Sequence, residues 1–76
     1  MARAYLSIMI RSGFEDVVRE GLLDIKGVTA ADLTTGGQDI IAVIEGDTYE
    51  DIVQSVLGQV RTLRGVERTS TSLVVG

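Results

Sequence analysis

The chain has 76 residues, 45% of them apolar, and its seven basic and eleven acidic side chains leave a formal net charge of −4. It contains no Cys and no His, which excludes disulfides, thiolate metal sites and the commonest general base at neutral pH. So short a chain buries a small core, and we expect oligomerisation to stabilise it. The acidic balance argues against binding to nucleic acid. No segment resembles a signal peptide or is apolar enough to span a bilayer, so a cytoplasmic location without membrane contact is expected.

The first ten residues after Met1 have the alternation of a strand. If residues 2–11 are extended, one face carries Ala4, Leu6, Ile8 and Ile10, and the other carries Tyr5, Ser7, Met9 and Arg11. The first of these is the expected core face. The second is too apolar for a purely solvated surface, and we expect another subunit to cover it.

A first helix is predicted after this strand. Ser12 and Glu15 have the spacing of a capping box, which indicates that the helix starts there. Lys26 and Gly27 end it, as a cation in the last turn followed by a residue that adopts left-handed backbone easily. Lys26, the only lysine, is better explained by the helix dipole than by activation of a nucleophile. The expected apolar stripe is Phe14, Val17, Val18, Leu22 and Ile25.

A second helix has the cleaner amphipathic pattern. Its start carries the capping spacing twice, in Asp47 with Glu50 and in Thr48 with Asp51, and both alternatives are open. It ends at Arg64-Gly65. The expected apolar stripe is Tyr49, Ile52, Val53, Val56, Leu57, Val60 and Leu63.

The remaining segments complete a small α+β domain over residues 1–76. Residues 28–35 and 39–45 predict two strands joined as a hairpin, and residues 66–75 predict a last strand. Ile25-Lys26-Gly27-Val28 and Leu63-Arg64-Gly65-Val66 form a weak internal repeat at the two passages from helix to strand. Two strand–helix–strand halves give βαββαβ, a ferredoxin-like sandwich with two helices on one face of a four-stranded antiparallel sheet.

The hairpin segment Thr34-Thr35-Gly36-Gly37-Gln38-Asp39 is the first candidate site. Two glycines let backbone amides turn toward an anion, and Asp39 adds a carboxylate, so the segment complements a small zwitterion. The same residues suit an ordinary hairpin turn, and this alternative stays open. Asp32 and Asp39 could act as an acid/base pair or bind Mg²⁺, but nothing beside them indicates a reaction. No catalytic residue, metal or cofactor is therefore expected.

The hydroxyl-rich run Arg68-Thr69-Ser70-Thr71-Ser72 is the second candidate site. Thr and Ser at these positions are compatible with a partly solvated edge strand, or with a row of donors and acceptors lining a polar pocket. If this strand is extended, Thr69, Thr71, Leu73 and Val75 share one face, and Ser70, Ser72 and Val74 share the other.

Together these segments resemble the effector-binding domain of the Lrp/AsnC family, also called the RAM domain. The resemblance depends on Ala-Tyr-Leu-x-Ile in the first strand, the two helix-Gly-Val passages, T-G-x-x-D at Thr35 to Asp39, and R-T-x-T at Arg68 to Thr71. It covers nearly the whole chain. Because Met1 directly precedes the first strand, the chain looks like a stand-alone RAM protein without the family's DNA-binding helix-turn-helix.

The resemblance implies a ferredoxin-like fold, dimers of the α/β-barrel type formed by pairing sheets, and rings of dimers, commonly octameric. It also implies that a free amino acid binds where dimers meet, and that full-length Lrp/AsnC regulators are possible partners through co-assembly. Carried over position by position, the ligand-binding residues are Leu33, Thr35, Gly36, Gly37, Gln38, Asp39, Thr69 and Thr71. Many members have an acidic residue in place of Gly37 and a bulky one in place of Gln38, so the resemblance does not identify the amino acid.

The predicted function is a non-catalytic, amino-acid-binding and oligomerisation module that regulates amino-acid metabolism or transcription. Asp39 is expected to hold the α-ammonium group, amides of the loop the α-carboxylate, and Thr69 and Thr71 to complete the pocket. We further expect the loop to lie away from the sheet-pairing face, so that Asp39→Ala abolishes amino-acid binding and leaves the dimer intact. The alternatives are a structural ring without an effector and, less favoured in a chain without His, a small ferredoxin-like enzyme.

Overall fold

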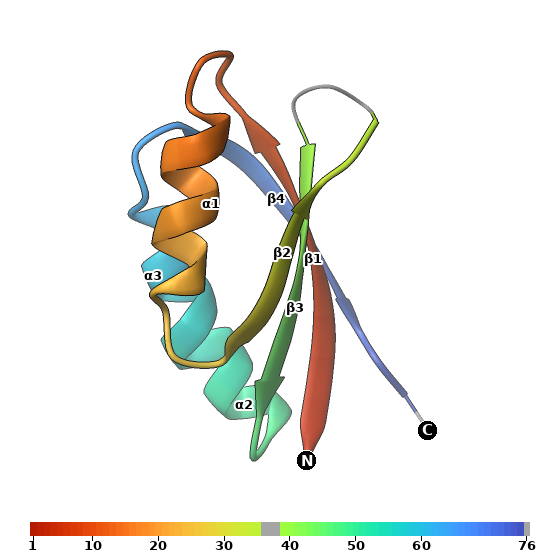
Figure 1. The fold of residues 1–76 in the computed structure, drawn as a ribbon. Helices are drawn as coiled ribbons and strands as arrows, with labels where there is room; N and C mark the ends of the chain where they lie inside the picture. Colours follow the sequence, from red (N-terminus) through yellow and green to blue (C-terminus); the bar gives the residue numbers. More distant parts are fainter. Residues whose placement is uncertain (36–38, 76) are drawn as a thin grey trace.

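The computed structural model describes residues 1–35 and 39–75 as a single sheet covered on one face by helices (Figure 1). The elements in chain order are β1 (Ala2–Ile10), α1 (Glu15–Leu23), β2 (Val28–Leu33), β3 (Asp39–Gly46), α2 (Tyr49–Asp51), the π-helical turn η1 (Ile52–Val56), α3 (Leu57–Arg61) and β4 (Val66–Leu73). The strands lie in the order β2-β3-β1-β4, and all neighbours are antiparallel. The predicted ferredoxin-like α+β fold is confirmed.

Strand β1 occupies the centre of the sheet and supplies much of the core. Its buried and exposed residues alternate without interruption, as predicted. The buried face consists of Ala2, Ala4, Leu6, Ile8 and Ile10. Strand β3 repeats the alternation, with Ile40, Ala42 and Ile44 buried beside it. The opposite faces of both strands are left uncovered by helices.

Each helical segment contacts the sheet through a narrow stripe of side chains. The buried members of these stripes are Val18, Leu22 and Ile25 in the first half and Ile52, Val56, Leu57 and Val60 in the second. Val17, Val53 and Tyr49 were expected in the stripes, but they are 58%, 50% and 40% exposed. The prediction was wrong for these three because a helix beside a sheet has only one side to bury, and flanking apolar residues turn away from it.

The two predicted capping boxes have different outcomes. Helix α1 starts at Glu15 with Phe14 at its N-cap position and without a capping side chain, so the prediction for Ser12 was wrong. Gly13 adopts φ +94°, and the amide of Phe14 donates to the carbonyl of Arg11, so a tight turn separates Ser12 from the helix. In the second half, the Thr48 hydroxyl accepts a hydrogen bond from the Asp51 amide at 3.1 Å. Of the two alternatives, Thr48 with Asp51 is therefore the one realised.

The internal repeat corresponds to two turns with the same hydrogen bonds. Val28 donates to Ile25 in one turn, and Val66 donates to Leu63 in the other. The glycines between them have φ of +105° at Gly27 and +99° at Gly65, and both of their carbonyls accept a backbone amide at 2.8 Å. The repeat is thus a structural equivalence of the two halves.

Lys26 belongs to the first of these turns. Helix α1 ends at Leu23 with Asp24 as its C-cap and has no basic residue in its last turn. The prediction that Lys26 lies in the last turn of the helix was therefore wrong. The Lys26 side chain is exposed at one end of the sheet.

Within the part of the chain that the structure describes, there is no helix that is both long and apolar enough to cross a membrane.

The Gly65 turn provides a test of the packing between the two halves. A Cβ atom at Gly65 would lie 2.5 Å from Cβ of Phe14, whereas one at Gly13 would meet nothing within 4 Å. Gly13→Ala should therefore cost only the left-handed backbone term, about 1–2 kcal/mol of unfolding free energy. Gly65→Ala adds an overlap and should cost about 2–4 kcal/mol. Urea denaturation at fixed protein concentration measures both, and equal losses would contradict the predicted contribution of Phe14.

Gly58 offers the matched control for this pair. It lies within α3, has φ outside the left-handed region, and a Cβ atom there would meet nothing within 4 Å. Gly58→Ala should stabilise the protein by up to about 1 kcal/mol, because alanine is the better helix former.

The two capping positions provide a second test. Thr48→Ala removes the hydroxyl that accepts the Asp51 amide and should cost about 1 kcal/mol of unfolding free energy. Ser12→Ala removes no cap and should change stability by less than about 0.5 kcal/mol. Thermal unfolding of the two variants compares them directly. A larger loss of stability for Ser12→Ala than for Thr48→Ala would indicate that Ser12, and not Thr48, caps a helix.

Candidate functional site

The hairpin between β2 and β3 places three of the predicted ligand-binding residues. Leu33 ends β2, Thr35 follows in the turn, and Asp39 begins β3. The amide of Thr34 donates to the carbonyl of Asp39 at 3.1 Å and closes the hairpin. The other three predicted loop residues, Gly36, Gly37 and Gln38, lie outside the described residues.

Asp39 and the β4 residues of the predicted site point to opposite faces of the sheet. Asp39 is opposite Met9 in the register and alternates with buried Ile40, so its side chain is on the uncovered face. Thr69 is opposite Ile8 and therefore faces the helices, and Thr71, two residues along the strand, shares that face. The Asp39 side chain therefore lies at the rim of the uncovered face, and the position of the loop relative to a sheet-pairing face stays a prediction.

The hairpin and β4 are also separated across the sheet. Leu33 pairs with Ile40, Ile40 with Ile8, and Ile8 with Thr69, so three strand spacings lie between the first residue and the last. At the usual spacing of neighbouring strands, this is about 14 Å. A single chain therefore does not bring Leu33 and Thr69 to one small ligand.

The uncovered face of the sheet is mixed in character, and four rows of side chains cross it. They are Asp39, Met9 and Arg68; Asp32, Ile41, Ser7 and Ser70; Ala30, Val43, Tyr5 and Ser72; and Glu45 with Arg3. Its middle is apolar: Tyr5 and Met9 are 45% and 40% exposed, and Ile41 and Val43 are half-buried beside them. Charged residues lie at both ends of this apolar strip.

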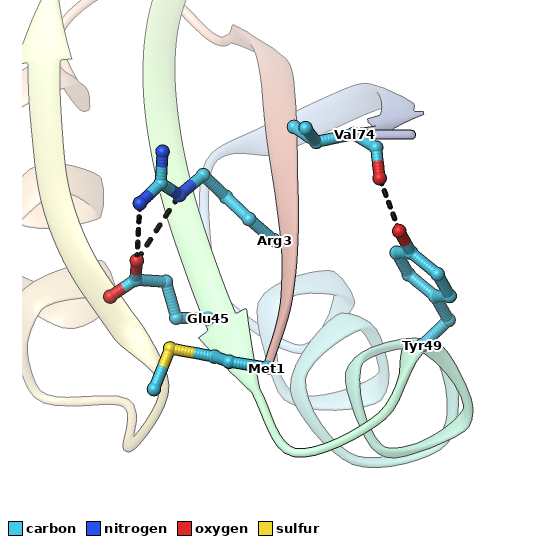
Figure 2. Close-up of a pocket in the computed structure, with 5 residues that line it drawn as sticks. All are labelled: Met1, Arg3, Glu45, Tyr49 and Val74. Atoms are coloured by element: carbon cyan, nitrogen blue, oxygen red, sulfur yellow. Dashed lines mark hydrogen bonds and ion pairs between the residues drawn. The ribbon is translucent and has the colours of Figure 1, made fainter. Parts of the chain in front are cut away.

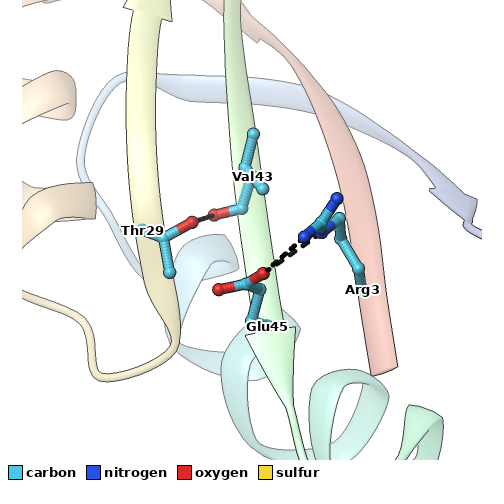
Figure 3. A network of polar contacts seen from close by, with 4 residues as sticks. All are labelled: Arg3, Thr29, Val43 and Glu45. Carbon is cyan, nitrogen blue, oxygen red and sulfur yellow. Dashed lines mark hydrogen bonds and ion pairs between the residues drawn. The ribbon is translucent and has the colours of Figure 1, made fainter. Parts of the chain in front are cut away.

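An ion pair between the neighbouring strands β1 and β3 lies at one end of the uncovered face (Figure 3). Nε and Nη2 of Arg3 lie 3.1 Å and 3.0 Å from the same oxygen of Glu45, Oε2. The hydrogen bond to Glu45 raises the pKa of the Arg3 guanidinium above its ordinary value, so this group stays charged throughout the physiological range. Beside the pair, the Thr29 hydroxyl donates to the carbonyl of Val43 at 3.3 Å.

A hollow of about 300 Å³ lies next to this ion pair, lined by Met1, Arg3, Glu45, Tyr49 and Val74 (Figure 2). The Tyr49 hydroxyl donates to the carbonyl of Val74 and so ties the start of the helical segment to the end of β4. The stretch of β3 from Asp39 to Glu45 places this hollow about 20 Å from the hairpin. Its charged pair was missed at the sequence level, where the predicted strands carry opposite charges but have no assigned order or register.

The described residues offer little for metal binding or catalysis. Among them, no three His, Cys, Asp or Glu side chains come together as a metal site. All polar or charged residues of this part of the chain are at least partly exposed. The arrangement provides a carboxylate, an ion pair and hydroxyl groups, which suits recognition of a polar ligand.

Comparison with known proteins gives a consistent result over the whole chain. The family model described as Lrp/AsnC ligand binding domain matches residues 3–76. Among curated proteins, none matches significantly. The crystal structure of FFRP-DM1 is 29% identical with a TM-score of 0.89, covering 99% of this chain and 100% of that one. TTHA0845 from Thermus thermophilus is 26% identical with a TM-score of 0.90, covering 100% of this chain and 95% of that one.

A more distant similar structure is a complex with an amino acid. It is the transcriptional regulator NMB0573 from Neisseria meningitidis in complex with L-Met, at 18% identity and a TM-score of 0.66. The similarity covers 99% of this chain and 50% of that one, and at this identity it shows a shared fold.

Proposed function

Because this chain belongs to the Lrp/AsnC ligand-binding family, we propose that it binds a free amino acid at a site completed between chains, without catalysing a reaction on it. The observation that carries the proposal is the placement of Asp39 and Thr69 on opposite faces of one sheet. A ligand that contacts both needs one of them from a second chain. The L-Met complex of the Neisseria regulator supports the ligand class.

The loop residues have distinct roles in this proposal. Asp39 holds the α-ammonium group, since a carboxylate makes strong charge-assisted hydrogen bonds to it. Amides of the loop hold the α-carboxylate. Thr69 and Thr71, supplied by a neighbouring chain, complete the polar lining with hydroxyls that both donate and accept.

Pairing of the uncovered sheet faces supplies the first step of assembly. The apolar strip of Tyr5, Met9, Ile41 and Val43 gains from removal of water by a second copy. Dimers then assemble into a ring, for which eight chains is our working size. A ligand that bridges chains shifts this equilibrium by its difference in affinity between assemblies. Co-assembly with full-length Lrp/AsnC regulators would convert that shift into control of transcription.

The substitution Ile41→Glu tests whether the uncovered face pairs two chains. A carboxylate at the middle of the apolar strip, next to Asp32, should reduce the assembly to monomers, because an unpaired charge is costly to bury. Size-exclusion chromatography with light scattering gives the mass, and circular dichroism confirms folding. Val17→Glu, which adds the same charge to an exposed apolar position on α1, should keep the wild-type mass. If Ile41→Glu also keeps the wild-type oligomeric mass, face pairing is excluded.

The role of Asp39 is tested by titration calorimetry with a panel of amino acids. Asp39→Ala should weaken binding of the best ligand by about 10- to 100-fold, the usual value of a hydrogen bond to a charged group. Asp32→Ala removes a carboxylate from the same face and should leave affinity unchanged. If wild-type rings give no heat with any amino acid, the chain has a purely structural role in assembly.

A further inference from the structure

We propose that this chain has a second ligand site, a hollow of about 450 Å³ at the end of the sheet away from the hairpin, and that it takes a small zwitterion such as an α-amino acid. The end of β3, the turn between α1 and β2, and the first turns of the second helical segment surround it. Its volume is within the range of small-molecule pockets, about 300–1,000 Å³. The proposal shares its ligand class with the proposed function, but its location and its formation within one chain are independent of it.

One wall of the hollow is the π-helical turn η1. The amide of Leu57 donates to the carbonyl of Ile52, five residues back, which widens the helix there. Such turns inside α-helices are rare and are frequently found at functional sites. Ile52, Ser55 and Val56 all line the hollow; the two apolar side chains are part of the core, and Ser55 is exposed at the rim. The π turn thus places a hydroxyl at the rim, above core side chains that are 0% and 6% exposed.

Two glycines bring backbone directly onto these two core side chains. A Cβ atom at Gly27 would lie 3.0 Å from Cγ2 of Val56, and one at Gly46 would lie 3.2 Å from Cγ1 of Ile52. Both glycines line the hollow. Main chain therefore forms its other walls, where side chains would narrow it.

The rim carries charges of both signs, which decides the ligand class. Lys26 belongs to the turn between α1 and β2, Asp47 to the turn after β3, and Asp51 to α2. Carboxylates recognise an ammonium group, and the lysine recognises a carboxylate. The hollow therefore matches both ends of a zwitterion.

The location separates this site from the hairpin. Glu45 and Gly46 at the end of β3 line the hollow, about 20 Å along the strand from Asp39. All of its groups come from one chain. Binding here should therefore persist in the Ile41→Glu monomer, whereas a site completed between chains should be lost in it.

The test is titration of the isotope-labelled protein with L-leucine, followed through amide NMR signals. We expect saturable shifts at Gly27, Gly46 and Ser55. Ser55→Leu fills the hollow and should abolish these shifts, whereas Gln54→Leu, at the neighbouring exposed position, should retain them. Asp39→Ala should also retain them. Circular dichroism checks the fold of each variant.

Two analogues test the assignment of charges. 4-Methylpentanoate lacks the ammonium group and 3-methylbutylamine lacks the carboxylate, so each should bind at least about 10-fold more weakly than leucine. Lys26→Gln should weaken leucine but leave 3-methylbutylamine unchanged. Equal affinities for 4-methylpentanoate and leucine would contradict recognition of the ammonium group by the two aspartates. They would therefore also overturn the assignment of a zwitterionic ligand.

The outcomes distinguish the two proposals. Shifts confined to Thr35, Asp39 and Thr69 would support the hairpin site and overturn the second one. Shifts at Gly27, Gly46 and Ser55 alone would support the second site and leave the hairpin as a turn. Shifts at Gly27 and Gly46 that persist in Ser55→Leu would overturn the second site, as would the absence of shifts at Gly27, Gly46 and Ser55 in the wild type up to about 10 mM leucine.

Discussion

Burial of one face of strand β1 beneath the helices positions both candidate sites. Its core-facing side chains are at most 5% exposed, so the strand has no freedom to rotate or to slip by one residue without moving the core into solvent. Strands β3 and β4 pair with β1 on either side, and they inherit its register. Asp39 is consequently directed to the uncovered face and Thr69 to the helices, which is why a ligand that touches both must lie between chains.

The same register gives the sheet two chemically different ends. At one end the hairpin presents Asp39 beside the apolar strip, and at the other Arg3 meets Glu45 next to two hollows. A strand of eight residues keeps these ends about 20 Å apart. The chain thus has room for one site that depends on assembly and one that does not. The substitutions that test one site leave the residues of the other unchanged.

The two halves of the chain are equivalent in their turns and different in their helices. Gly27 and Gly65 have nearly the same φ and the same hydrogen-bond pattern. The first helix is regular and uncapped, whereas the second begins with the Thr48 cap and contains the π turn. Only the second half therefore has a widened helical wall, and the larger hollow lies against it. The proposed ligand site is located where the repeat is broken.

The order of the elements, the core face of β1 and the glycine turns were determined by the sequence alone, because periods of 2 and 3.6 and left-handed glycines are local properties. The direction of Asp39 was not, since the run Ile40 to Ile44 is apolar throughout and hides which face is buried. Hydroxyls on both faces of residues 69–72 hide it in β4 as well. Pairing with β1 decided both and brought Arg3 to Glu45, whereas packing of the second helical segment brought the π turn to Gly27 and Gly46. Such contacts depend on register and packing between distant segments, which only the tertiary structure determines.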